Sequence, residues 1–161
     1  MKKMIVSLAL CLLSLNSQAS DSEPKKQAAQ LLQATAVLDM IKLSSPGLNP
    51  ACLDKAWKKR SIELLDAYQQ EYSLDELKTL NQFFTGWLGK RYIADLANQV
   101  RASKGLPVMQ PSQFSEQDKQ QVQEFFETST GKKFSSGASA KRMNDVGIQT
   151  GMALAMDCYK K

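Results

Sequence analysis

The side chains that could do chemistry are the first constraint on this chain. The sequence contains no histidine, so the commonest general base and the commonest zinc ligand are missing. Glu63 and Asp66 are one helical turn apart, and paired carboxylates at a suitable separation can hydrolyse a glycosidic bond. Acids at this spacing are more typical of a solvated helix face. We therefore predict no catalytic, cofactor-binding or metal-binding residues.

The sulfur chemistry is equally limited. Of the three cysteines, Cys11 lies in an apolar leader, which leaves Cys52 and Cys158 in the body of the chain. An isolated pair in an oxidising compartment is most simply a disulfide. A redox-active pair is the alternative, but the C-x-x-C spacing typical of such pairs is missing.

The leader itself predicts export. Lys2 and Lys3 precede an apolar run over residues 4–15, and Ser17-Gln18-Ala19 matches the small-x-small cleavage pattern. We expect a signal peptide over residues 1–19, cleavage after Ala19, a periplasmic location and a single domain over residues 20–161. The apolar run is too short to span a membrane. The formal net charge of +5, part of it in the leader, is too small to indicate a nucleic-acid partner.

The middle of the chain carries one pattern twice. Residues 72–92 align without gaps with residues 114–134, and we expect repeat units of about 72–102 and 114–157. Each copy opens with a serine followed three residues later by an acid, which is the signature of a capping box at a helix start. A phenylalanine pair and a Gly-Lys pair follow at helical spacing. The shared positions are Phe83, Phe84, Gly89 and Lys90 in the first copy, and Phe125, Phe126, Gly131 and Lys132 in the second.

The glycines predict a break after each phenylalanine pair. Gly86 and Thr128 are acceptable caps for a new helix. Gly89 and Gly131, one turn further on, would let that helix approach a neighbour closely. A phosphate-cradling turn is the functional alternative, although a single Gly-Lys lacks the spacing of a phosphate-binding loop.

This combination of motifs resembles the bacterial family called domain of unknown function 2059, whose signature joins an acid-rich helix start, an aromatic pair and a Gly-Lys run. The proline of that signature is replaced here by Trp87 and Ser129. The resemblance implies a small exported helical protein and brings no activity with it. The matching residues are Asp75, Glu76, Leu77, Phe83, Phe84, Gly89 and Lys90 in the first copy, and Phe125, Phe126, Thr128, Gly131, Lys132 and Lys133 in the second.

The remaining segments are also typical of helices. A first helix ends at the breaker cluster over residues 44–47, and Asn49 and Pro50 start a second. Residues 103–113 form a linker, and a long sixth helix follows the short fifth one. Strand signals are nearly absent, so we predict an all-α bundle of five or six helices built on two related helix-break-helix units.

The sixth helix carries a row of small and polar residues, which predicts a tight packing face within the molecule or, alternatively, a homodimer seam. The row consists of Ala140, Asn144, Gly147, Gly151 and Ala155.

These observations favour a non-catalytic exported binding or interaction protein of the bacterial envelope, with an unknown protein or an apolar ligand as its partner. Two alternatives stay open. One is a small carboxylate-dependent hydrolase of envelope polymers, with Glu63, Asp66 or Glu76 as its acids. The other is an inhibitor or immunity protein against an envelope-targeting enzyme.

Overall fold

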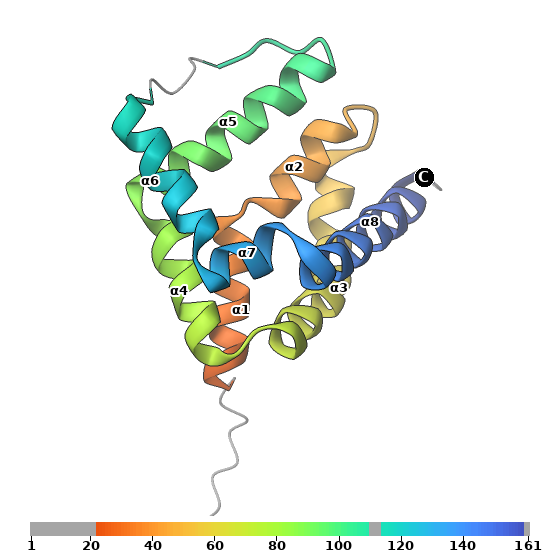
Figure 1. The fold of residues 1–161 in the computed structure, drawn as a ribbon. Coiled ribbons are helices and arrows are strands. Elements are labelled where there is room, and N and C mark those ends of the chain that lie inside the picture. The colour runs from red at the N-terminus through yellow and green to blue at the C-terminus, as the bar shows by residue number, and fades with distance from the viewer. Residues whose placement is uncertain (1–21, 110–113, 160–161) are drawn as a thin grey trace, which may run out of the picture.

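The computed structural model describes residues 22–109 and 114–159, and within them every regular element is an α-helix (Figure 1). This confirms the predicted all-α class. The predicted leader over residues 1–19 lies outside the described residues. The helices are α1 (Glu23–Ala34), α2 (Val37–Ser44), α3 (Pro50–Glu71), α4 (Leu74–Thr85), α5 (Trp87–Ser103), α6 (Glu116–Glu127), α7 (Ser129–Ser135) and α8 (Gly137–Tyr159).

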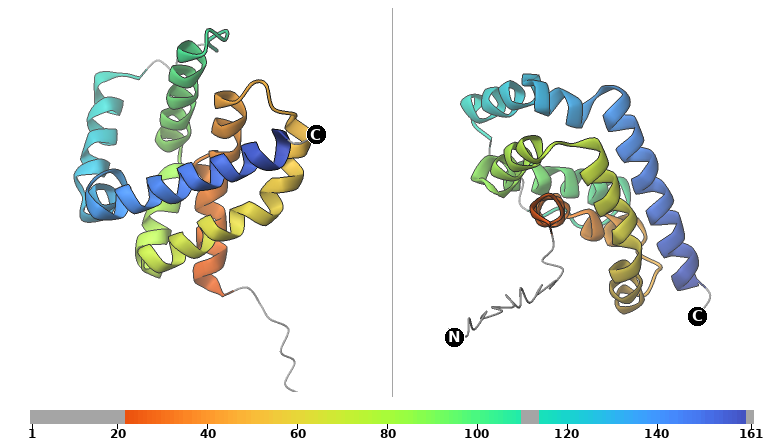
Figure 2. Two further views of the ribbon diagram at one scale, coloured as in Figure 1. Left: turned by 90° about the vertical axis from the view of Figure 1, so that its right-hand side faces the viewer. Right: turned by 90° about the horizontal axis from the view of Figure 1, so that it is seen from below.

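Helix α1 lies at the centre of the packing. Figure 2 shows it end-on in the view from below, with α3 and α4 beside it, and both helices pack against it. Leu31 of α1 meets Leu77, Leu80 and Phe84 of α4 in the main core, and each of these side chains is almost completely buried. Removing this much apolar surface from water is the main force that holds the three helices together.

Two predicted helices are each divided in the structure, which raises the number of described helices to eight. The first divides at Ala36, whose φ of 51° is left-handed. The sixth divides at Ser136 and Gly137, where Ser136 is extended and Gly137 has a φ of 77°. Glycine tolerates this conformation, whereas alanine does not adopt it readily. Tertiary packing therefore overrides local helix propensity at Ala36.

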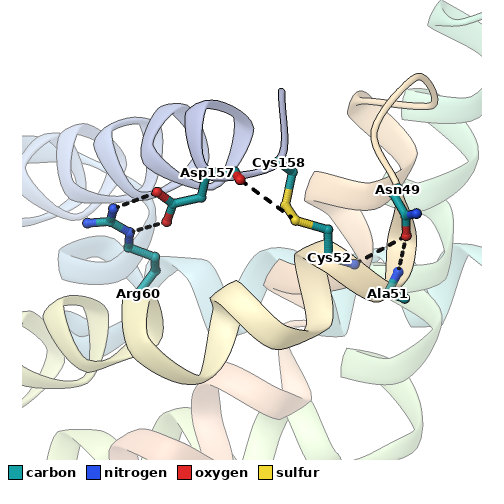
Figure 3. Close-up of a disulfide and its surroundings, with 6 residues drawn as sticks. All are labelled: Asn49, Ala51, Cys52, Arg60, Asp157 and Cys158. Atoms are coloured by element: carbon teal, nitrogen blue, oxygen red, sulfur yellow. Dashed lines mark hydrogen bonds and ion pairs between the residues drawn. A yellow bond between two sulfur atoms is a disulfide. The ribbon is translucent and has the colours of Figure 1, made fainter. Parts of the chain in front are cut away.

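Helices α3 and α8 run antiparallel, and Figure 2 shows them side by side. Near one end the predicted disulfide joins Cys52 to Cys158 (Figure 3). Their Cα atoms are 5.8 Å apart. Arg60 donates two hydrogen bonds to Asp157 nearby, at 2.8 and 3.0 Å. A cross-link over a sequence separation of 106 residues contributes about 4–5 kcal/mol in the chain-entropy model.

The other end of the α3–α8 pair is held by Glu71. Its carboxylate accepts two hydrogen bonds from Arg142, at 2.7 and 2.8 Å, and a further one from Ser139. Hydrogen bonding by Arg142, and next by Ser139, lowers the pKa of Glu71 to about 2. The two helices are thus tied covalently at one end and by a bidentate ion pair at the other.

We predict that Ala36→Gly stabilises the protein by about 0.5–1 kcal/mol, because glycine relieves the left-handed strain at a small entropic cost. Chemical denaturation measures the change. Ala29→Gly, at an exposed position inside α1, is the matched control and should destabilise by about 1 kcal/mol. If both substitutions lowered the free energy of unfolding equally, the α1–α2 corner would not be strained.

We also predict that Glu71 makes stability depend on pH. Because the pKa of Glu71 is lowered to about 2, its contribution is present above the ordinary pKa of about 4.5 and is lost as pH falls from there toward 2. Glu71→Gln should lower the melting temperature at neutral pH and flatten its fall between pH 5 and 2. Asp66→Asn, an exposed change on the same helix, should leave that fall intact. If the melting temperatures of wild type and Glu71→Gln fell by the same amount between pH 5 and 2, this role would be contradicted.

Candidate functional site

The two aligned segments fold into the same local structure. Ser73 and Ser115 each accept a hydrogen bond from the backbone N–H three residues on, and Glu76 and Asp118 reach back to the serine N–H groups. Both predicted capping boxes are therefore present. Gly86 and Thr128 then start α5 and α7.

The glycine positions are explained by a close approach of two backbones. A Cβ atom on Gly89 would lie 2.2 Å from the carbonyl oxygen of Phe83, and one on Gly131 would lie 2.0 Å from that of Phe125. Neither position has space for a side chain. The glycine of each Gly-Lys pair thus allows the close contact at the corner between two helices. The side chains of Lys90 and Lys132 are exposed.

The corners bring the two phenylalanine pairs together reciprocally. Phe83 stacks on Phe125, its partner in the alignment, with ring centroids 3.7 Å apart and parallel planes. The ring centroids of Phe84 and Phe134 are 5.0 Å apart, with an interplanar angle of 50°. The equivalent residues in the alignment, Phe126 and Tyr92, have ring centroids 5.2 Å apart and an interplanar angle of 51°. The two segments are therefore related by an approximate two-fold axis through the Phe83–Phe125 stack.

The charged residues follow the same relation. Lys133 donates to both carboxylate oxygens of Glu76, at 2.9 and 3.0 Å, and lies 5.2 Å from the ring centroid of Tyr72. Burial would raise the pKa of Glu76, but the bonds from Lys133 and Ser73 lower it.

In the other segment, Arg91 takes the place of Lys133. It lies 5.3 Å from the ring centroid of Phe114. Hydrogen bonds from Ser115 lower the pKa of Asp118, and the charge of Arg91 adds to this effect. The sequence analysis placed Glu76 and Lys133 in the repeated motif, but it did not predict that the basic residue of one copy faces the acid of the other.

Beside the aromatic cluster lies an apolar groove of about 670 Å³. We call it the aromatic groove. It lies between α2 on one side and α5, α6 and α7 on the other, within the size range typical of small-molecule sites. Its lining residues are Thr35, Val37, Met40, Tyr68, Phe84, Tyr92, Ile93, Leu96, Gln99, Val100, Ser103, Phe126, Phe134 and Ser135.

The groove exists because α2 and α5 are incompletely covered. Tyr92, Leu96 and Val100 follow one another at i+4 spacing, yet all three are only half-buried, and Gly89 is the one buried residue of α5. Helix α2 has no buried residue among its eight, although five of them are apolar. Apolar side chains that would normally complete a core instead form the walls of a groove.

Six lining residues carry a polar group, but none of them is charged, and the hydroxyls of Ser103 and Ser135 donate to carbonyl oxygens of their own helices. Thr35 donates its hydroxyl to the carbonyl oxygen of Leu31 at 2.8 Å, which occupies that donor. Burial raises the pKa of Tyr68 to about 12, against the opposing effect of a hydrogen bond with Thr35, so its phenol stays neutral. The described lining contains no charged side chain, and the arrangement suits an apolar group.

The small-residue row on α8 differs from the prediction. A Cβ atom on Gly147 or Gly151 would meet nothing within 4 Å, so the predicted tight packing face is wrong at these two glycines. The physical reason is that α8 packs on α3 through another face, with Thr150, Leu154 and Cys158 buried. The homodimer seam stays a prediction.

The candidate acids lie on the surface. Glu63 and Asp66 are exposed on α3, and Glu76 is engaged by its capping box and by Lys133. In residues 22–109 and 114–159, no three carboxylate or cysteine side chains gather as a metal site would need. None of the helices over those residues is long and apolar enough to cross a membrane.

Comparisons with known proteins found no matching family model, no matching curated protein and no matching solved structure.

Replacing each of three glycines by alanine tests whether the corners lack space for a side chain. Gly89→Ala and Gly131→Ala should each destabilise the protein by about 3 kcal/mol or more, because a methyl group would overlap a backbone carbonyl. Gly147→Ala is the matched control inside a helix with open space, and should stabilise by about 0.5–1 kcal/mol. Urea denaturation measures all three. Mild effects at Gly89 and Gly131 would show that the corners have room.

Proposed function

We propose that this chain is a non-catalytic binding protein of the bacterial envelope whose aromatic groove takes an apolar ligand. The observation that carries the proposal is the groove itself: about 670 Å³, walled by apolar and aromatic side chains from the six helices α2 to α7 and lacking a charged residue in its described lining. Such a site gains binding free energy by removing apolar surface from water, and little else in it would orient a polar substrate.

The proposal includes export. A cleaved leader over residues 1–19 and a periplasmic location fit the Cys52–Cys158 disulfide, because disulfides persist in oxidising compartments. The motifs that resemble domain of unknown function 2059 form the two corners and the aromatic cluster, so we propose membership of that family on the same residues. They supply the rigid frame of the groove, with Phe84 and Phe126 in its wall.

We predict that the neutral fluorescent probe N-phenyl-1-naphthylamine binds the protein, and that Phe126→Ala weakens its binding about tenfold. Loss of one aromatic wall removes about 1–2 kcal/mol of apolar contact. Trp87→Ala is the control, because Trp87 is an exposed aromatic residue of α5 that does not line the groove. It should leave affinity within about twofold.

Fluorescence titration measures the affinities, and circular dichroism checks that both variants fold. Equal losses in the two variants would place the probe elsewhere, and absence of probe binding to the wild type would overturn the proposed function. Native mass spectrometry of protein purified gently from the envelope fraction would then identify any natural ligand.

A further inference from the structure

Helix α5 borders a second groove on its neighbouring face. This groove has a volume of about 740 Å³ and also lies between α2 and α5. We call it the basic groove, because three cations and a single acid line it. Its lining residues are Ala36, Asp39, Met40, Lys42, Leu43, Lys90, Ile93, Ala94, Ala97, Asn98, Arg101 and Met109.

The positive charge of the basic groove is only partly neutralised. Lys42 forms an ion pair with Asp54 at 2.6 Å. Lys90 and Arg101 form no ion pair with any residue in 22–109 or 114–159. They lie about 16 Å apart along the axis of α5, at 1.5 Å per residue, and small alanines occupy the face between them. An anionic group on this face would meet a surplus of positive charge.

The two grooves meet at a shared ridge. Met40 of α2 and Ile93 of α5 line both of them. On α5, Tyr92, Leu96 and Val100 point to the aromatic groove, and the face with Lys90 and Arg101 borders the basic groove. A flexible chain that crosses the ridge would therefore pass from a charged surface into an uncharged apolar one.

We propose that the ligand is a single-chain amphipathic anion of the fatty-acid type. Its alkyl chain lies in the aromatic groove, and its carboxylate lies in the basic groove near Lys90 or Arg101. This inference rests on the proposed function and adds the charge of the ligand to it. Ion pairing with a flexible lysine or a forked guanidinium recognises a carboxylate, and the apolar walls recognise the chain.

Displacement of N-phenyl-1-naphthylamine by decanoate and by 1-decanol, at pH 8 and low salt, tests the inference. The two displacers share a chain length and differ in charge. We expect decanoate to bind about tenfold more tightly than 1-decanol. The double variant Lys90→Gln/Arg101→Gln should abolish that preference and leave the affinity for 1-decanol unchanged. Added salt should reduce the difference in affinity between decanoate and 1-decanol, because it screens cations that face solvent.

The matched control is Lys58→Gln/Lys59→Gln, which removes the same charge from an exposed part of α3. It should keep the preference for decanoate. Equal affinities of the wild type for decanoate and 1-decanol would overturn the inference and leave the proposed function standing. An unchanged preference in the Lys90/Arg101 variant would also overturn it. If neither displacer nor the probe binds, both proposals fail.

Discussion

Two close backbone contacts determine the arrangement of the aromatic cluster. At each corner, the carbonyl oxygen of a phenylalanine occupies the space where a side chain of Gly89 or Gly131 would be. This allows α5 to turn sharply away from α4, and α7 from α6. The turn leaves the Phe83 and Phe125 rings free to stack on each other, since the following helix leads away from them.

The stack in turn sets the contacts around it. Because Phe83 and Phe125 occupy equivalent positions, the ring contacts beside them form a matching pair: Phe84 with Phe134, and Phe126 with Tyr92. Aromatic pairs of this kind contribute about 0.5–1.5 kcal/mol beyond their buried area. The ion pair of Glu76 with Lys133 lies at the rim of the same contact. The result is a rigid wall on one side of the aromatic groove.

The opposite wall is held much less firmly. Helix α2 follows the left-handed Ala36, has no buried residue and lines both the aromatic and the basic grooves. Elements with few buried apolar contacts open at low free energy. The α3–α8 pair, closed by the disulfide and by Glu71, provides the fixed support beside it. A rigid wall opposite a weakly packed helix is consistent with a site that adapts to a flexible chain, as we propose.

Much of the local structure follows from short-range rules that can be read in the sequence. Ser73 and Ser115 start helices because their hydroxyl oxygens accept hydrogen bonds from backbone N–H groups a few residues away, and the side-chain amide oxygen of Asn49 does the same for α3. The disulfide was predictable because few cysteines were available to pair. Each of these predictions needed only neighbouring residues or simple composition.

The grooves and the reciprocal pairing could not be derived in this way. The i+4 row of α5 has the same pattern whether another helix covers it or not, so its periodicity does not distinguish a core face from a groove wall. Likewise, Gly147 and Gly89 are both glycines within helices, yet only Gly89 has a backbone against it. Which surfaces meet depends on contacts between segments far apart in the chain, and these exist only once the helices have packed together.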